Sequence, residues 1–156
     1  GSGKDENKRA PMYWNKDGNA EGMCKGPADM DDFRMKFDSL EEQQEDPDSI
    51  YNYVKQVIRV RNQNPVIARG TTAYLEQYSG EQCFALTRSY EGSNLLLLGN
   101  TSAEAVSVDL TGLTVGGTTA EELVLLGELY TGEETAERAG TVVTLPAYSI
   151  LILGEE

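Results

Sequence analysis

The chain carries many carboxylates, but their spacing does not define a catalytic site. Two carboxylic acids held at a suitable separation can act as an acid and a base, or as an acid and a nucleophile. The most closely spaced acidic residues of the first third of the chain include Asp29, Asp31, Asp32, Glu41, Glu42, Asp46 and Asp48. Their segment is polar and offers no apolar pocket that would shift their pKa values. We therefore predict no catalytic residue in this chain and interpret these side chains as solvated surface.

The side chains most often used for metal binding and base catalysis are scarce. The sequence contains no His and only two Cys, Cys24 and Cys83. His is the commonest metal ligand and the usual general base, and two Cys in different contexts form neither a metal cluster nor a disulfide framework. We therefore expect no metal and no cofactor. We expect both thiols to be free, with a single bridge as the alternative.

The composition indicates a soluble globular protein with an acidic surface. The chain has 156 residues, of which 39% are hydrophobic and 25% charged, and its net charge is −13. An acidic surface repels nucleic-acid phosphates and anionic membranes. The longest apolar run, residues 95–98, is much shorter than the roughly 18 residues that span a bilayer. We therefore expect neither nucleic acid nor a membrane as a partner. Gly1-Ser2-Gly3 resembles a cloning remnant, so we expect the natural chain to begin upstream.

The sequence pattern divides the chain into three segments. Residues 1–45 are polar and show no sustained period, so they cannot bury enough surface to offset their ordering entropy alone. We expect them to form a long, loop-rich and mobile segment. Residues 46–65 predict one amphipathic helix, and residues 66–156 change to the two-residue period of β-strands. The fold class predicted from this order is mainly β, preceded by one helix and a long irregular segment.

The predicted helix has clear start and stop signals. Asp46 is a good N-cap and Pro47 suits the first helical position, while Asn64-Pro65 disfavours continuation. The helix is therefore expected to run from residue 47 to residue 63. Its apolar face contains Ile50, Val54, Val57 and Ile58. We expect the last three of these residues to dock the helix on the β-rich segment.

Seven short strands separated by turn signals are expected after the helix. They cover residues 71–78, 82–89, 94–99, 105–110, 123–129, 141–145 and 148–153. Residues 95–98 lack alternation, so that strand is expected to be covered on both faces, and residues 111–119 form a Gly- and Thr-rich loop. The pattern favours an antiparallel sandwich or barrel. Tyr74, Tyr78 and Tyr90 could form a binding platform, or they could be ordinary strand packing.

The motif with the most specific spacing lies near the N-terminus. It reads Asn7-Lys8-Arg9-Ala10-Pro11-Met12-Tyr13-Trp14-Asn15. It resembles the loop after the eighth barrel strand in the α-glucosidase and oligo-1,6-glucosidase branch of glycoside hydrolase family 13, which typically reads Asn-Ala-Arg-Thr-Pro-Met-Gln-Trp-Asp. Five of the nine positions agree, and the departures are Lys8, Ala10, Tyr13 and Asn15. The replacement of Gln by Tyr13 leaves the sugar specificity open.

Later stretches resemble the same family in the same order. Asp46-Pro47-Asp48-Ser49-Ile50 matches an Asp-Pro-x-Ser-Ile motif, and residues 60–65 match a helix end of the form Leu-Arg-x-x-x-Pro. Residues 83–88 are similar to a Val-Phe-Ala-Tyr-x-Arg strand, and residues 95–100 to the strand that follows it. The resemblance implies the last loop and last helix of a (β/α)8 barrel, followed by the antiparallel β-sandwich of the α-amylase C-terminal domain type.

The resemblance also implies a function. The parent enzyme would cleave α-glucosidic bonds in starch-derived oligosaccharides with two carboxylates that lie upstream of these residues. This chain would be inactive alone, would brace the catalytic barrel of the same parent chain, and would add a loop to the rim that meets the α-glucan oligosaccharide. The alternatives are a carbohydrate-binding β-sandwich module for starch-like glucans and a purely structural domain. The cellular location stays open, with an extracellular or cell-envelope bacterial enzyme as one expectation for the parent.

Two residues of the loop are the substrate-binding candidates that the resemblance implies. In exo-acting relatives an Arg at the position of Arg9 helps to hold the non-reducing glucose, and a guanidinium can donate two parallel hydrogen bonds. The alternative is that Arg9 pins the loop to the barrel rim. Trp14, the only Trp, would form an aromatic wall beside the sugar, or it would be a packed anchor for the loop.

Overall fold

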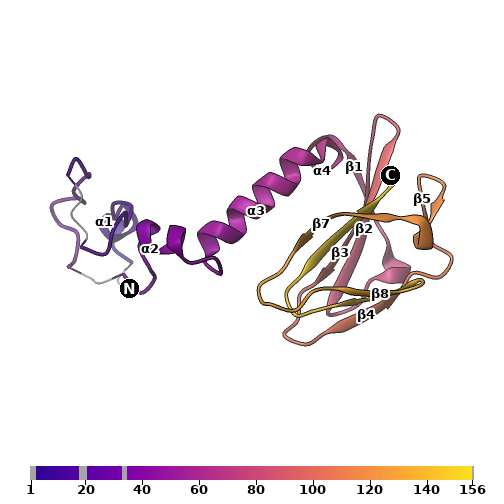
Figure 1. Cartoon of the computed structure of the whole chain (residues 1–156). Coiled ribbons are helices and arrows are strands. Elements are labelled where there is room, and N and C mark those ends of the chain that lie inside the picture. Colours follow the sequence, from indigo (N-terminus) through magenta and orange to yellow (C-terminus); the bar gives the residue numbers. More distant parts are fainter. Residues whose placement is uncertain (1–2, 18–20, 33–34, 156) are drawn as a thin grey trace. The chain divides into compact units, whose positions relative to one another are not determined.

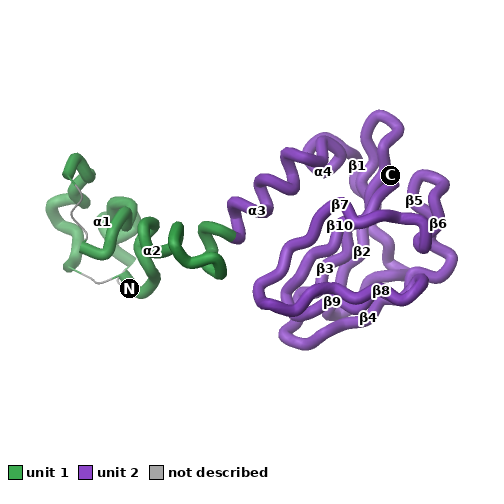
Figure 2. The backbone as a smooth tube through the Cα atoms, in the orientation of Figure 1, with its two compact units in different colours: residues 1–52 green, residues 53–156 purple. Residues whose placement is uncertain are grey.

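The computed structural model describes residues 3–17, 21–32 and 35–155. These residues form two compact units, Gly1–Asn52 and Tyr53–Glu156 (Figure 2). Among the described residues, no helix has the length and apolar character that crossing a membrane requires.

The N-terminal unit is mostly irregular but contains two short helices that the sequence pattern does not predict. Helix α1 covers Asp5–Lys8 and helix α2 covers Leu40–Glu45 (Figure 1). Lys4 Nζ lies 3.0 Å from Asp31 Oδ1, and the Asn7 side chain both donates to the Asp31 carboxylate and accepts the Asp31 backbone N–H, at 2.8 and 2.9 Å. These contacts tie the start of the unit to residue 31, across a separation of about 25 residues.

The long helix α3 covers Ile50–Gln63 and begins three residues later than predicted. Asp46 is the C-cap of α2, and its carboxylate accepts the backbone N–H of Asp48 in the turn that follows. Ser49 instead caps α3, because its hydroxyl accepts the backbone N–H of Asn52 at 3.2 Å. The predicted end at Gln63 is correct, but Pro65 then begins a further short helix, α4, over Pro65–Arg69. Pro suits this position because the first helical N–H has no partner to lose.

The prediction that Val54, Val57 and Ile58 dock the helix is wrong for two of the three residues. Val54 and Ile58 are 45% and 51% exposed, and Val57 is half-buried. The contact to the sheet runs instead through Val60, whose Cγ1 would lie 3.0 Å from a Cβ built on Gly127. The sequence period therefore identifies an apolar stripe, of which Val54 and Ile58 are exposed while Val57 and Val60 are half-buried.

The second unit is built from antiparallel strands, so the predicted β-rich fold class is confirmed (Figure 1). The larger sheet has the strand order β1-β2-β3-β10-β7, and the second sheet has the order β4-β9-β8. The larger sheet consists of Thr71–Tyr74 (β1), Cys83–Tyr90 (β2), Ser93–Asn100 (β3), Ile150–Gly154 (β10) and Val124–Leu129 (β7). The second sheet consists of Val106–Asp109 (β4), Val142–Leu145 (β9) and Glu137–Ala139 (β8).

The hydrophobic core lies between these two sheets, as expected for a sandwich. The larger sheet contributes Ala85, Leu96, Leu98, Leu151 and Leu153, and the second sheet contributes Val108, Val143 and Leu145. Leu95 and Ile152 alternate with these core residues and are only 1% and 2% exposed. Since α4 packs against β2 and β3, β3 is covered on both faces at Leu95, Leu96 and Leu98, as predicted for residues 95–98, while Leu97 is half-buried.

Three local features differ from the predicted strands. Strand β1 ends at Tyr74, because Glu76–Tyr78 forms a 3-10 helix. The loop over residues 111–119 contains a small hairpin of Thr114–Val115 (β5) and Thr118–Thr119 (β6), and a second 3-10 helix follows at Ala120–Glu122. Gly116 and Gly117 turn this hairpin with φ of 63° and 102°, which favours glycine at both positions. Strand β8 is exposed and polar, so it carries no apolar period that could reveal it.

Candidate functional site

Arg9 lies directly after α1 and engages its own helix. Its Nε atom lies 3.2 Å from Asp5 Oδ2, in an i,i+4 ion pair whose side chains are 59% and 73% exposed. Its backbone N–H donates to the carbonyl of Glu6. An exposed pair of this kind holds the guanidinium only weakly, because water competes for both charges. The Arg9 guanidinium therefore stays accessible to a further hydrogen-bond acceptor.

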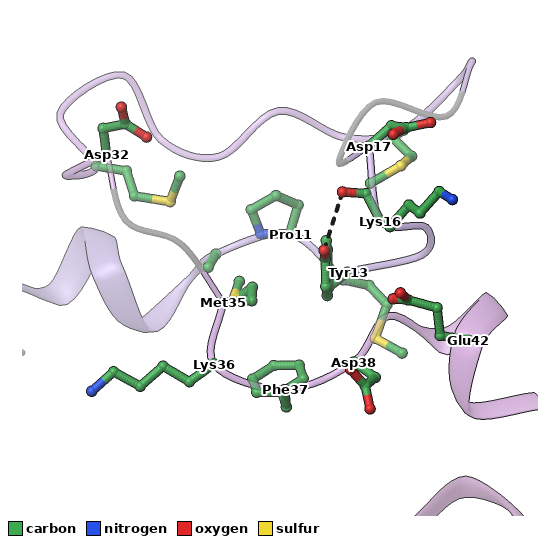
Figure 3. A pocket seen from close by; sticks show the side chains of 14 residues that line it. Pro11, Tyr13, Lys16, Asp17, Asp32, Met35, Lys36, Phe37, Asp38 and Glu42 are labelled. Carbon is green, nitrogen blue, oxygen red and sulfur yellow. Dashed lines mark hydrogen bonds between the residues drawn. The ribbon is translucent and has the colours of Figure 1, made fainter. Parts of the chain in front are cut away.

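The next part of the loop is held by the first turn of α2. The backbone N–H of Leu40 donates to the carbonyl of Tyr13 at 2.9 Å, and that of Glu41 donates to the carbonyl of Trp14 at 3.0 Å. The Tyr13 ring packs edge-on against Phe37, with centroids 6.3 Å apart and planes at 78°. Its hydroxyl donates to the carbonyl of Lys16 at 3.2 Å (Figure 3). The backbone at Trp14 is thus fixed while the Trp14 side chain is 47% exposed.

The turn that holds the loop begins with a capping box. The Ser39 hydroxyl accepts the backbone N–H of Glu42, and the Glu42 carboxylate accepts the backbone N–H and the hydroxyl of Ser39 at 3.0 and 2.7 Å. Ser39 is completely buried. The hydrogen bonds from the Ser39 hydroxyl and N–H lower the pKa of the Glu42 carboxyl. The signal for this box, Ser39-x-x-Glu42, is present in the sequence, but it precedes the helix predicted over residues 47–63 and was missed there.

An open cavity of about 940 Å³ lies beside the loop (Figure 3). Its apolar lining includes Pro11, Tyr13 and Phe37, together with all four methionines of the chain, Met12, Met23, Met30 and Met35. Thioether side chains are flexible and polarisable, so they form an adaptable apolar surface. Charged side chains such as Lys16, Asp17 and Asp32 also contribute to the lining.

Asn15, which follows Trp14, has a buried side-chain oxygen with no hydrogen-bond partner among the described residues. A buried acceptor without a donor costs about 1–3 kcal/mol. In the sequence, Asn15 stands out only as a departure from the family motif. In the structure, its side-chain oxygen is a buried acceptor of the loop that lacks a donor among the described residues.

Of the acidic residues singled out from the sequence, only Asp32 and Glu42 line the cavity. Asp29, Asp31, Asp32, Glu41, Glu42, Asp46 and Asp48 are all exposed. Within residues 3–17, 21–32 and 35–155, no three side chains of the His, Cys, Asp and Glu types group together as metal ligands would. Both cysteines are free, as predicted, with Cys24 exposed and Cys83 half-buried.

The three tyrosines considered as a platform do not share one environment. Tyr78 packs against the core and donates its hydroxyl to the carbonyl of Thr111 at 3.2 Å. Tyr90 lies beneath the Arg69 guanidinium, 6.0 Å from ring centroid to Cζ. Only Tyr74 of the three is widely exposed, at 60%. Packing therefore accounts for Tyr78 and Tyr90.

Comparison with solved structures identifies proteins that contain a region with the same fold. Eubacterium rectale Amy13B is 38% identical to the chain and superposes with a TM-score of 0.87, over 100% of this chain and 29% of that protein. The chain belongs to glycoside hydrolase family 13. The match spans the whole chain at a substantial identity, so it supports the resemblance found in the loop, the helix and the strands together. Neither a family model nor a curated protein sequence matches the chain.

More distant family 13 structures share the fold. The α-amylase from H. orenii is 21% identical with a TM-score of 0.64, over 93% of this chain and 28% of that protein. The trehalulose synthase MutB is 23% identical with a TM-score of 0.67, over 92% of this chain and 24% of that protein. The chain thus spans between about a quarter and 29% of each of these proteins. It corresponds to a domain-sized part of a family 13 enzyme, in agreement with the predicted C-terminal region.

Proposed function

We propose that this chain braces the catalytic barrel of a family 13 enzyme and supplies one loop of its substrate rim. The observation that carries the proposal is the 38% identity over the entire chain with an enzyme of which it covers 29%. The remaining part of such an enzyme provides the catalytic carboxylates. The chain alone is therefore inactive, and the substrate of the complete enzyme is an α-glucan oligosaccharide.

Exposed apolar side chains support the bracing role. In the N-terminal unit Met12, Trp14, Phe37 and Ile50 are 53%, 47%, 62% and 78% exposed. In the second unit Val54 and Ile58 continue the stripe of α3 and are also exposed. Each unit by itself therefore exposes large apolar side chains that a partner surface could cover. The barrel of the same parent chain is the partner that the family match favours.

The rim role is assigned to Arg9 and Trp14. Arg9 has an accessible fork that can donate two hydrogen bonds to sugar hydroxyls, and it is held only by the exposed pair with Asp5. Trp14 combines a fixed backbone with a half-exposed ring, which suits a wall against one face of a glucose unit. Both residues lie on the same nine-residue loop.

The bracing role can be tested by changing the exposed face of α3. Val54 and Ile58 are replaced together by Ser, both in the isolated chain and in the complete enzyme. Because both residues are exposed in the chain, its unfolding midpoint should hardly change, whereas the melting temperature of the complete enzyme should fall by several degrees. The matched control is Leu125→Ser, which removes an apolar side chain that is 53% exposed on β7. Equal effects of the two changes in the complete enzyme would count against the barrel as the partner of this stripe.

A further inference from the structure

The first turn of α2 divides its backbone N–H groups between two tasks. The first N–H groups of any helix lack partners within that helix. In α2, the N–H of Glu42 is taken by the Ser39 hydroxyl, whereas those of Leu40 and Glu41 donate outside the helix, to the carbonyls of Tyr13 and Trp14. Two consecutive amides therefore bind two consecutive carbonyls. This pairing fixes both the position and the direction of the loop backbone at Trp14.

The direction of those two amides depends on the capping box. Ser39 has an extended backbone, with φ −63° and ψ 163°, and its N–H and hydroxyl are both bound to one carboxylate oxygen of Glu42. Ser39 is completely buried, and its carbonyl also accepts the N–H of Gln43 at 2.9 Å. Without the box, the turn loses the contacts that hold residues 39–42 in place, and the amides of Leu40 and Glu41 are free to rotate away from the loop.

We propose that Ser39 and Glu42 are positioning residues whose reciprocal hydrogen bonds orient the Trp14 side chain through the backbone pairing of Leu40 and Glu41 with Tyr13 and Trp14. Neither residue needs to touch the substrate for this role. The consequence for sugar binding rests on the proposed function of Trp14. The mechanical coupling between the capping box and Trp14 does not rest on it.

The coupling can be measured directly because Trp14 is the only Trp in the chain. Its fluorescence anisotropy and its quenching by acrylamide report how firmly the ring is held. Ser39→Ala and Glu42→Ala should each raise the quenching constant about two-fold and lower the anisotropy, since each removes one half of the box. Glu42→Gln should restore the values of the unmodified chain, because Glu42 is exposed and Gln forms the same box. Glu41→Ala is the matched control, since it removes a neighbouring carboxylate but keeps the backbone N–H.

A second probe separates local release from loss of the whole unit. The backbone N–H of Asp31 donates to the Asn7 side chain at 2.9 Å, in a contact that does not involve α2. Its hydrogen-exchange protection should persist in Ser39→Ala and Glu42→Ala. The proposal is overturned if Trp14 is equally quenched in all variants, if Glu42→Gln fails to restore the values of the unmodified chain, or if protection of Asp31 is lost together with the order of Trp14.

Measuring KM and kcat of the complete enzyme separates the positioning role of Ser39 from the substrate role of Trp14. In the complete enzyme, Ser39→Ala should raise the KM for a maltooligosaccharide several-fold with a small effect on kcat, and Trp14→Ala should do the same. If Ser39→Ala mobilises the ring but Trp14→Ala leaves KM unchanged, the positioning role stands and the substrate role of Trp14 fails. If Trp14→Ala raises KM but Ser39→Ala neither mobilises the ring nor changes KM, the positioning role fails and the proposed function stands.

Discussion

The side-chain nitrogen of Asn100 donates a hydrogen bond to the carbonyl oxygen of Pro146 at 2.9 Å, and this bond joins the end of β3 to the turn after β9. The same nitrogen donates to the carbonyls of Glu104 and Leu145, while the side-chain oxygen accepts the N–H and hydroxyl of Ser102. Asn100 is only 3% exposed. A single side chain therefore connects the two sheets of the sandwich through buried polar groups.

Replacing Asn100 by Ala should strongly destabilise the sandwich. The change removes the hydrogen bonds to the carbonyls of Glu104, Leu145 and Pro146, and a hydrogen bond within a protein contributes about 0.5–1.5 kcal/mol. We expect the free energy of unfolding in urea to fall by about 3 kcal/mol. Asn62→Ala, at an exposed position of α3, is the control and should change it by less than about 0.5 kcal/mol. Similar losses from both changes would contradict the role given to Asn100.

A second prediction concerns Gly99, which lies opposite Phe84 in the pairing of β2 with β3. A Cβ added at residue 99 would overlap the Phe84 ring, so the ring covers the space that a side chain would need. Gly99→Ala should lower the free energy of unfolding by about 1–3 kcal/mol, as overpacking commonly does. In the Phe84→Leu background, the added cost of Gly99→Ala should be smaller. A double-mutant cycle measured by urea unfolding tests this coupling, and strict additivity of the two changes would argue against it.

These contacts show which parts of the second unit could be predicted from its sequence. Alternating apolar residues and turn signals located the strands that bury one face, and the unbroken run at residues 95–98 correctly indicated burial on both faces. The strand at Glu137–Ala139 is short and exposed, so no burial pattern marks it. The cross-links made by Asn100 depend on residues about 45 positions away, and a local pattern carries no information about such pairs.

The start of helix α3 was predicted three residues too early, and the reason lies in the choice of its N-cap. Asp46 is the N-cap that the sequence predicts, but Ser is an equally favourable N-cap residue. The structure selects Ser49, because its buried side chain also donates to the carbonyl of Gln43 at 2.5 Å and so fixes the turn between α2 and α3. The candidate site was located by the loop motif around Arg9 and Trp14. Its support by Ser39 and Glu42, about 25 residues later, follows only from the folded backbone.

The capping box should respond to pH. The Ser39 hydroxyl and N–H donate to the Glu42 carboxylate, and these bonds, with a smaller contribution from the charge of Lys16, lower the pKa of Glu42 from its ordinary value of 4.5. A carboxyl with a lowered folded-state pKa contributes stability above its unfolded pKa and loses that contribution as the pH falls through the folded value. We therefore expect the box to be intact above about pH 4.5 and to open progressively below it.

NMR can follow this opening through the amide resonances of Leu40 and Glu41, whose N–H groups bind the loop. Their shifts should change with a midpoint below the ordinary Glu value in the unmodified chain. In Glu42→Gln the same transition should disappear, because the amide forms the box without titrating. A transition of unchanged size in Glu42→Gln would assign the effect to another carboxyl.

The last prediction tests whether the Arg9 guanidinium binds the sugar or acts only through its ion pair with Asp5. If Arg9 only holds the loop through Asp5, then Asp5→Ala and Arg9→Ala should have equal and small effects, since an exposed ion pair contributes about 0–1 kcal/mol. If the Arg9 fork binds the sugar, Arg9→Ala should raise the KM of the complete enzyme for a maltooligosaccharide at least ten-fold, corresponding to about 1.4 kcal/mol. Asp5→Ala should then leave KM nearly unchanged. Arg9→Lys should recover only part of the loss, because an ammonium cannot reproduce two parallel hydrogen bonds. Equal KM values for Arg9→Ala and Asp5→Ala would restrict Arg9 to holding the loop.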